Sequence, residues 1–323
     1  MAQDKPLNKS GAARRAKVIA VGGAKGGIGK SLFVTNVGVF LSQLGKKVVM
    51  VDLDLGGANL HLYMGVWNLA RRIDDFLSRN VASIDDIMTA TKYGPDLIGG
   101  GGGKLGAANI HFSRKLKLLR ALKTIDADYV ILDLGGDTTY NILDFFLAAD
   151  QGLVLTTCDP ASYMDAYGFT KMALHRKLVR LFGAESVYRQ YRDVAVEQVV
   201  KAFVYSTSGE MGSRISDLVA RLQKETPVQH KLVTTVLERF QPGIVVTMSE
   251  GQEQVAELVA RLQKVSAKML SIKMNYLGDM PYASEVRNSA RNLVPCVADS
   301  MDSPLARALR RIVLKMEMAE SSE

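Results

Sequence analysis

The segment that decides the fold runs from residue 18 to residue 45 and reads VIAVGGAKGGIGKSLFVTNVGVFLSQLG. It begins with a short apolar run, passes through a glycine-rich turn, and ends in a stretch whose apolar residues recur at helical spacing. Those recurring residues are Phe33, Val34, Val37, Phe40, Leu41 and Leu44. The segment therefore predicts a strand, a loop and a helix. Because glycines let backbone N–H groups point inward and a helix amino terminus adds the positive end of its dipole, we expect phosphate to bind here.

The loop carries the residue types that phosphate chemistry needs. Lys30 is placed to reach the β- and γ-phosphates of a nucleotide, and the hydroxyl of Ser31 is placed to bind Mg²⁺. The pattern G-x-x-x-x-G-K-[ST] is not met in full, because Ala24 stands at its first glycine position. The predicted nucleotide contacts in this loop are Ala24, Lys25, Gly26, Gly27, Ile28, Gly29, Lys30, Ser31 and Leu32.

Acidic residues end two further apolar runs. The run VVMVDLD ends in Asp52 and Asp54, which are two residues apart, so both side chains lie on the same side of a strand. The run YVILD ends in Asp133, at the carboxyl end of a predicted parallel strand, where ligand sites form in open α/β sheets. A carboxylate there is suited to hold hydrated Mg²⁺. We therefore predict a metal site that includes Ser31 and Asp133.

The remaining sequence alternates short β-branched runs with helical stretches. This alternation predicts a doubly wound α/β fold, with a mostly parallel sheet and helices on both faces. The predicted strands are Lys17–Gly22, Lys47–Asp52, Tyr129–Leu134, Gly152–Thr157, Gly243–Met248 and Met274–Gly278. Between about residues 175 and 241 the alternation breaks into charged sequence, which predicts a helical insertion. We expect a flexible basic tail over residues 1–16, one nucleotide-binding domain over 17–303, and an amphipathic helix and tail over 304–323.

Composition limits the class of protein without choosing a partner. The chain has 323 residues, of which 47% are hydrophobic and 23% charged, as in ordinary globular proteins. Its net charge of +8 favours polyanions, whether nucleotide, nucleic acid or acidic lipid. The opening MAQDKPLNKSGAARRAK has no apolar run, so it predicts neither a signal peptide nor a membrane span, and we expect a cytoplasmic protein. Cys158 and Cys296 lie outside any C-x-x-C spacing and predict two reduced thiols.

The local sequence KGGIGKS contains a second lysine, Lys25, and from this point the chain resembles the ParA and MinD group of ATPases, whose deviant P-loop carries that lysine. The resemblance covers roughly residues 17–316. It implies a slow ATPase with ATP and Mg²⁺ as cofactors, and an ATP-bound homodimer in which Lys25 reaches the partner's phosphates. It also implies that Asp54 positions the attacking water, and that Asp52 lies near the outer shell of the metal. Lys25 and Asp54 are therefore the predicted catalytic residues.

The resemblance extends to the γ-phosphate sensor and the base contact. Gly135 and Gly136 match switch II, whose backbone N–H senses the γ-phosphate, although the family's usual proline is absent. The adenine-contacting asparagine of the family corresponds to Thr247, at the end of the predicted strand IVVTM. A threonine there can hydrogen-bond a base but with less specificity, so the sequence leaves the preference for adenine open.

Within that group the chain is most similar to the flagellar number regulators FlhG and FleN. The similar stretches are FFLAADQGLVLTTCDPASYMDAYGFTKM and YLGDMPYASEVRNSARNLVP. This resemblance implies a regulatory partner, either an FlhF-like GTPase or a transcription regulator. The GTPase partnership lacks support in MAQDKPLNKSGAARR, which does not show the family's DQAxxLR-like element. We also hypothesise that the insertion at residues 175–241 binds a partner specific to this lineage.

The last helix leaves the surface on which the protein works open. The stretch PLARALRRIVLKMEM places apolar residues on one stripe and Arg307, Arg310, Arg311 and Lys315 elsewhere. Such a helix can lie on an anionic membrane surface, here the inner face of the cell membrane. Alternatively, it can pack on the sheet. A DNA-partition ATPase that binds nonspecific DNA is the alternative function. An iron–sulfur carrier is disfavoured because the two cysteines lack the required spacing.

Overall fold

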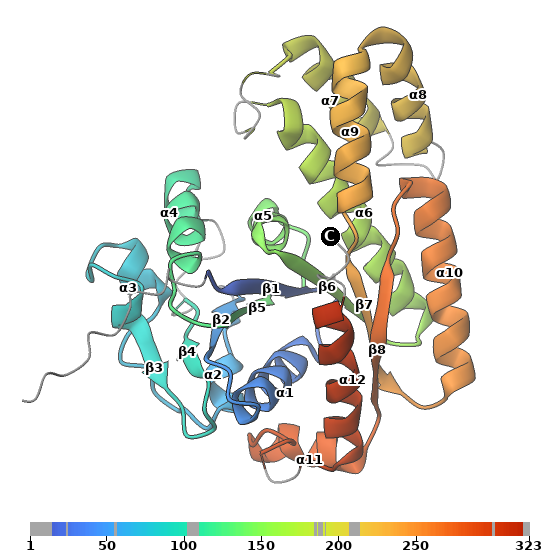
Figure 1. Ribbon diagram of the computed structural model, residues 1–323. Helices are drawn as coiled ribbons and strands as arrows, with labels where there is room; N and C mark the ends of the chain where they lie inside the picture. The colour runs from blue at the N-terminus through green and yellow to red at the C-terminus, as the bar shows by residue number, and fades with distance from the viewer. Residues whose placement is uncertain are drawn as a thin grey trace, which may run out of the picture.

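The computed structural model describes residues 15–23, 25–54, 57–101, 110–183, 186, 190, 192–206, 214–298 and 301–318. Its centre is an eight-stranded sheet in the order β3-β4-β2-β5-β1-β6-β7-β8 (Figure 1). The strands are β1 (Lys17–Gly22), β2 (Val48–Leu53), β3 (Met88–Ala90), β4 (Asp96–Ile98), β5 (Tyr129–Leu134), β6 (Gln151–Thr156), β7 (Gly243–Ser249) and β8 (Asn275–Pro281). All neighbours pair in parallel except β3, which is antiparallel to β4. The predicted doubly wound α/β fold is confirmed.

The strand predictions agree with the structure to within one residue at each end, except that β8 extends to Pro281. The central strands β2 and β5 are buried at every position, because helices cover both faces of a parallel sheet. The prediction omitted β3 and β4. The helices are α1 (Lys30–Gln43), α2 (Leu60–Tyr63), α3 (Ile73–Leu77), α4 (Phe112–Leu122), α5 (Tyr140–Ala148), α6 (Pro160–Phe182), α7 (Val194–Ser206), α8 (Ile215–Glu225), α9 (Pro227–Arg239), α10 (Gln252–Leu270), α11 (Ser284–Asn292) and α12 (Pro304–Met318), with a 3₁₀ turn at Asp85–Ile87.

Two apolar layers hold the helices to the sheet. One layer joins α1, α2 and α12 to one face, through residues such as Phe33, Leu60 and Leu309. The other layer joins helices α3 to α10 to the opposite face, through residues such as Phe145 of α5 and Phe169 of α6. The P-loop, which joins β1 to α1, and the ends of β2 and β5 therefore lie together at the carboxyl edge of the sheet.

The region expected to be a helical insertion is built from the end of α6 and from α7, α8 and α9, which stand above one end of the sheet (Figure 1). His175, where the alternation of the sequence breaks, lies inside α6 and is buried. The apolar run Ala202–Ser206, which has the composition of a strand, belongs to α7.

Helix α12 packs on the sheet through its apolar stripe. Leu305, Leu309, Ile312, Val313 and Met316 are all buried. The seat on β8 is tight at Gly278, where an added Cβ would lie 2.7 Å from the Cγ1 of Ile312. Of the two placements that the sequence left open for this helix, on a membrane or on the sheet, the structure shows packing on the sheet.

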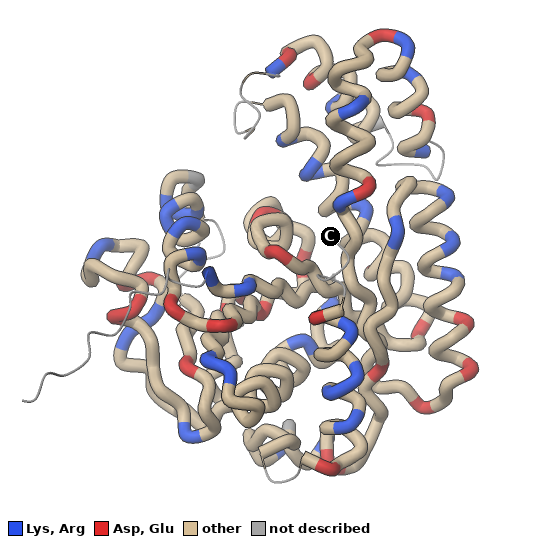
Figure 2. Tube along the Cα trace, viewed as in Figure 1, with Lys and Arg blue, Asp and Glu red and all other residues tan. Residues whose placement is uncertain are grey.

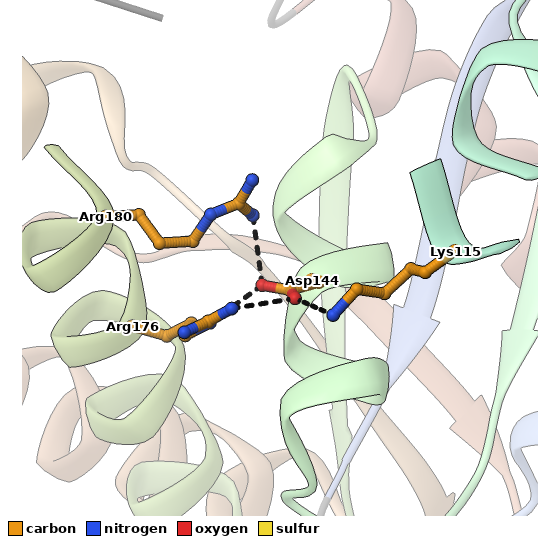
Figure 3. Close-up of polar contacts among 4 residues, drawn as sticks. All are labelled: Lys115, Asp144, Arg176 and Arg180. Atoms are coloured by element: carbon orange, nitrogen blue, oxygen red, sulfur yellow. Dashed lines mark hydrogen bonds and ion pairs between the residues drawn. The ribbon is translucent and has the colours of Figure 1, made fainter. Parts of the chain in front are cut away.

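A buried ionic cluster joins three helices on the other face (Figure 3). The carboxylate of Asp144 in α5 accepts hydrogen bonds from Lys115 of α4 and from Arg176 and Arg180 of α6. The Arg176 Nε to Asp144 Oδ1 distance is 2.8 Å, and the Arg180 Nη1 to Asp144 Oδ1 distance is 3.0 Å. Although burial opposes ionisation, the hydrogen bonds from Arg176 and Lys115 and the charge of Arg180 hold the pKa of Asp144 below its ordinary value.

Candidate functional site

The glycine-rich loop has the backbone conformation that its sequence requires. Gly27 and Gly29 adopt φ values of 79° and 88°, which are unfavourable for residues with a Cβ. An added Cβ at Gly26, Gly27 or Gly29 would meet no atom within 4 Å, so these glycines leave open space on one side of the loop. The predicted contact Ala24 lies outside the described residues. The loop thus presents its backbone to an open concavity, as phosphate binding needs.

Lys30 lies under the loop and bonds back to it. Its Nζ donates to the backbone oxygen of Lys25 at 2.8 Å, and the side chain is buried. Burial lowers the pKa of Lys30, while the nearby charges of Asp133, Asp54 and Asp137 raise it. The side chain of Lys25 is exposed, in contrast. The side chain of Lys30 therefore contacts the loop of its own chain, whereas that of Lys25 faces solvent.

Asp133 combines complete burial with an unused oxygen. It is only 2% exposed, and its Oδ1 has no hydrogen-bond partner among the residues that the structure describes. Burial, followed by the charge of Asp52, raises the pKa of Asp133 to about 8, although a hydrogen bond from Ser31 and the charge of Lys30 oppose this. A buried carboxylate without a complete set of partners costs free energy, and a bound cation removes that cost.

These observations fit Mg²⁺. The hydroxyl of Ser31 and the carboxylate of Asp133 are adjacent oxygen ligands, which is the chemistry that Mg²⁺ prefers. Among the described residues, no three His, Cys, Asp or Glu side chains converge to hold a metal ion by themselves. A magnesium ion here would therefore depend on water and on nucleotide phosphates for its remaining ligands, as is usual for this ion.

Asp52 and Asp54 play different parts in the loop after β2. Both oxygens of Asp52 accept backbone N–H groups, from Asp54 at 3.1 Å and from Leu60 at 3.0 Å. Burial nevertheless raises the pKa of Asp52 to about 6. Asp54 is only partly buried, and its Oδ1 accepts the N–H of Gly57 at 3.1 Å. Asp52 therefore shapes the loop, whereas Asp54 is open to solvent beside the P-loop.

Switch II meets both neighbouring loops through its glycines. An added Cβ at Gly136 would lie 3.0 Å from the nitrogen of Gly26, so the two backbones touch. An added Cβ at Gly135 would lie 3.4 Å from Oδ1 of Asp54. The structure thus brings together the P-loop, Asp54 and the glycines predicted to form switch II at one edge of the sheet.

Thr247 holds the P-loop from behind. Its side chain is buried, and its Oγ1 donates to the backbone oxygen of Ile28 at 2.7 Å, with the oxygen of Thr156 at 3.2 Å. Ile28 is itself buried. The hydroxyl of Thr247 therefore already has protein partners and supports the P-loop. The contact between Thr247 and a nucleotide base stays a prediction.

An apolar cavity of about 200 Å³ lies beside this loop. Gly29, Leu32 and Thr247 form one wall. The other wall comes from the end of β8 and the start of α11, with Pro281, Tyr282 and Arg287. The guanidinium of Arg287 lies over the ring of Tyr282, 5.4 Å from its centroid. This cavity has the place and polarity for a nucleotide base. The sequence analysis noted this second wall, within YLGDMPYASEVRNSARNLVP, only as a family resemblance and did not assign it to the site, because only the fold brings it to the P-loop.

The chain belongs to the CobQ/CobB/MinD/ParA nucleotide binding domain family, whose model matches residues 19–296. Among curated proteins it is similar to the antiactivator FleN of Pseudomonas aeruginosa, with 21% identity over 88% of this chain and 80% of FleN. It is also similar to the septum site-determining protein MinD of Helicobacter pylori, with 28% identity over 46% of this chain and 56% of that protein.

Solved structures show the same fold. The cell division ATPase MinD of Pyrococcus furiosus matches 94% of this chain and 99% of its own, with 16% identity and a TM-score of 0.57. The MinD of Pyrococcus horikoshii, solved with Mg-ADP, matches 93% of this chain and 96% of its own, with 16% identity and a TM-score of 0.56. The resemblance to the ParA and MinD group that the sequence indicated is confirmed.

Proposed function

We propose that this chain is an ATP-dependent switch that binds ATP and Mg²⁺, forms a homodimer, and returns to the monomer when it hydrolyses ATP to ADP and phosphate. The observation that carries the proposal is the meeting of Lys30, Ser31, Asp54 and Asp133 around an open P-loop, beside a base-sized apolar cavity. Structures of relatives with Mg-ADP and with ATP support the choice of ligand.

Each residue has a defined task in this proposal. Lys30, which now donates to the oxygen of Lys25, would bind the β- and γ-phosphates instead. Ser31 and Asp133 would hold Mg²⁺, which would supply positive charge to neutralise the phosphates. Asp54 orients the attacking water, and Asp52 keeps the Asp54 loop in shape near the metal's outer shell. The exposed Lys25 completes the partner's site, so turnover is slow until the dimer forms.

The proposed biological role is the regulation of flagellar number or placement, or of another cellular position. It rests on the alignment with FleN over most of both chains and on similarity to the flagellum site-determining protein YlxH of Helicobacter pylori. We propose a cytoplasmic setting, with an additional regulatory protein, a transcription regulator or an FlhF-like GTPase, as partner. A MinC:MinD complex among the solved relatives is a precedent for such an assembly. Among the described helices, none is long and apolar enough to cross a membrane.

A DNA-partition ATPase is the second candidate, and one observation favours it. The exposed face of α12 carries Arg307, Arg310, Arg311 and Lys315, visible as blue segments along that helix in Figure 2. The apolar stripe that an anionic membrane would require is buried against the sheet. A basic, solvent-facing surface attracts DNA phosphates in a salt-dependent manner.

The test measures dimer formation and ATP turnover of wild type and Asp54→Ala. Asp54→Ala is expected to bind ATP, to accumulate as a dimer in light scattering, and to release phosphate slowly; Asp126→Ala, at an exposed position, is the control. Failure of both wild type and Asp54→Ala to dimerise with ATP would remove the switch. Adding anionic liposomes or DNA to the trapped dimer separates the roles, because retention by DNA alone that falls steeply with salt supports partition.

A further inference from the structure

A second cavity, of about 220 Å³, lies at the amino edge of the strands, opposite the P-loop. The starts of β6, β7 and β8 form its floor, and the end of α5 forms one side. Its other wall is the junction where α9 ends and the chain enters β7, a connection visible in Figure 1. The cavity therefore lies where the helices α7 to α9 rejoin the sheet.

Lys177 and Arg239 line this cavity, and neither forms an ion pair with an acid among the described residues. Lys177 of α6 is half-buried, and burial lowers the pKa of its ammonium with no carboxylate close enough to oppose it. Arg239 is the last residue of α9. Among the described residues that line the cavity, Asp150 is the only acid, and it already accepts from Arg15 Nη2 at 2.8 Å and from the N–H of Val18 at 2.9 Å. The cavity is left with unbalanced positive charge.

The contact that Lys177 does make is too weak to replace a counter-ion. Its Nζ lies 5.3 Å from the centroid of the Phe240 ring. A cation–π contact stabilises a charge by less than the desolvation of an unpaired ammonium costs. An anion in the cavity would offset that cost directly.

A side-chain amide adds unused hydrogen-bonding capacity. Gln151, at the start of β6, lines the cavity, and its buried Oε1 has no hydrogen-bond partner within the described part of the chain. Because an amide can rotate to present either its oxygen or its NH₂ group, Gln151 suits a ligand that carries both acceptors and hydroxyl donors. Carboxylate and phosphate groups, in part protonated or attached to hydroxylated carbons, have this character.

We propose that this cavity binds a small anion bearing a carboxylate or phosphate group, held by Lys177 and Arg239 and hydrogen-bonded by Gln151. The ligand would link α6 to the α9–β7 junction, and so would brace the helical region against the sheet. The site lies at the opposite edge from the nucleotide, and its occupation does not depend on the switch function.

The test uses isothermal titration with inorganic phosphate and, separately, with succinate. It is made in a Lys30→Ala background, so that the P-loop does not contribute. The variant Lys177→Gln is compared with Lys268→Gln, which makes the same charge change at an exposed position of α10. Losing one charged hydrogen bond should weaken binding by roughly tenfold or more in Lys177→Gln, whereas Lys268→Gln should match the parent.

Binding of phosphate alone or of succinate alone supports the proposal and identifies which group the site prefers. The midpoint of thermal unfolding should rise with the bound anion, because a ligand that binds only the folded state stabilises it. If Lys177→Gln fails to fold, Arg239→Gln at an exposed position gives the same comparison. The proposal is overturned if neither anion binds the parent at millimolar concentration, or if both cavity variants bind as tightly as the parent.

Discussion

Asp133 and Asp144 are two buried aspartates, one at the end of β5 and the other in the helix that follows it, and their surroundings are opposite. Asp144 is 1% exposed and is met by Lys115, Arg176 and Arg180. Asp133 is 2% exposed, has two further carboxylates nearby, and keeps one oxygen without a partner. The pKa of Asp144 is therefore lowered, and that of Asp133 is raised.

The difference separates a finished ionic cluster from an unfinished one. The Asp144 cluster satisfies its carboxylate within the chain and needs no ligand, so it serves to join α4, α5 and α6. The Asp133 cluster places carboxylates together beside the glycine-rich loop without enough partners, an arrangement that the proposed cation and nucleotide would complete. Burial alone does not mark a functional carboxylate, whereas burial with an unmet oxygen and further carboxylates nearby, as at Asp133, indicates a cation site.

The largest effect is expected from Asp144→Ala, which removes the shared partner of three cations. Breaking a buried ion pair costs about 3 to 5 kcal/mol, because the remaining charges stay buried without compensation. Denaturant unfolding measures this loss. Asp126→Ala, which removes an acid that pairs with Lys47 at an exposed site, should cost less than about 1 kcal/mol. Equal losses of unfolding free energy in Asp144→Ala and Asp126→Ala would show that the buried cluster contributes no more to stability than an exposed ion pair.

The next effect concerns the cation of the unfinished cluster. Lys30→Ala should lower kcat/KM for ATP by at least about a hundredfold, because the lost ammonium faces charge that develops on the phosphates. Phosphate release at several ATP concentrations measures it. Lys268→Ala should turn over ATP at the wild-type rate. A Lys30→Ala protein with near-normal turnover would show that this loop is not the catalytic P-loop.

The pH dependence of stability should have opposite signs at the two aspartates. Since the folded pKa of Asp133 is raised to about 8, the nucleotide-free folded state binds more protons than the unfolded chain above the ordinary pKa. Its stability should therefore fall as pH rises toward 8, and Asp133→Asn should remove that decline while it abolishes turnover that depends on Mg²⁺. Unfolding free energies at several pH values, without nucleotide, measure this.

The contribution of Asp144 runs in the other direction. Its folded pKa is lowered, so the stability it provides is fully present above the ordinary aspartate pKa and is lost as pH falls through the folded value. The difference in unfolding free energy between wild type and Asp144→Asn should therefore become smaller only at acidic pH. If that difference became larger at acidic pH, the pKa of Asp144 would not be lowered in the folded state.

The smallest effect is expected from Thr247→Val, which removes the hydroxyl that holds Ile28. One such hydrogen bond contributes about 1 kcal/mol, so KM for ATP should rise a few-fold. The preference for ATP over GTP should not change, because the hydroxyl supports the loop. A clear loss of that preference would instead make Thr247 a base contact. Competition of ATP and GTP for the site distinguishes the two results.

The sequence predicted the part of the site that is local in the chain. Lys30 and Ser31 are consecutive, and Asp133 ends a strand that is apolar throughout, so spacing and burial pattern sufficed. Strands β3 and β4 escaped because each has only three residues, too few for periodicity to reveal. The apolar run at the end of α7 had strand composition, but tertiary packing placed it in a helix.

Long-range features were not predictable from one sequence. The contact of Thr247 with Ile28 joins residues 219 positions apart. The partners of Asp144 come from two other helices and follow no motif. In such cases the side chains carry no local signal, because the partner is decided by how the helices pack on the sheet rather than by spacing along the chain.

The seating of α12 has a consequence for experimental design. Its apolar stripe is buried, and Ile312 fits against the backbone of Gly278 in the edge strand β8. Deleting α12 is one way to ask whether this chain uses it for localisation. In this chain the same deletion would uncover the last strand and one wall of the core, so a diffuse or aggregated truncated protein would report damage to the fold. Charge changes at Arg310 and Arg311, which face solvent, ask the localisation question without that confusion.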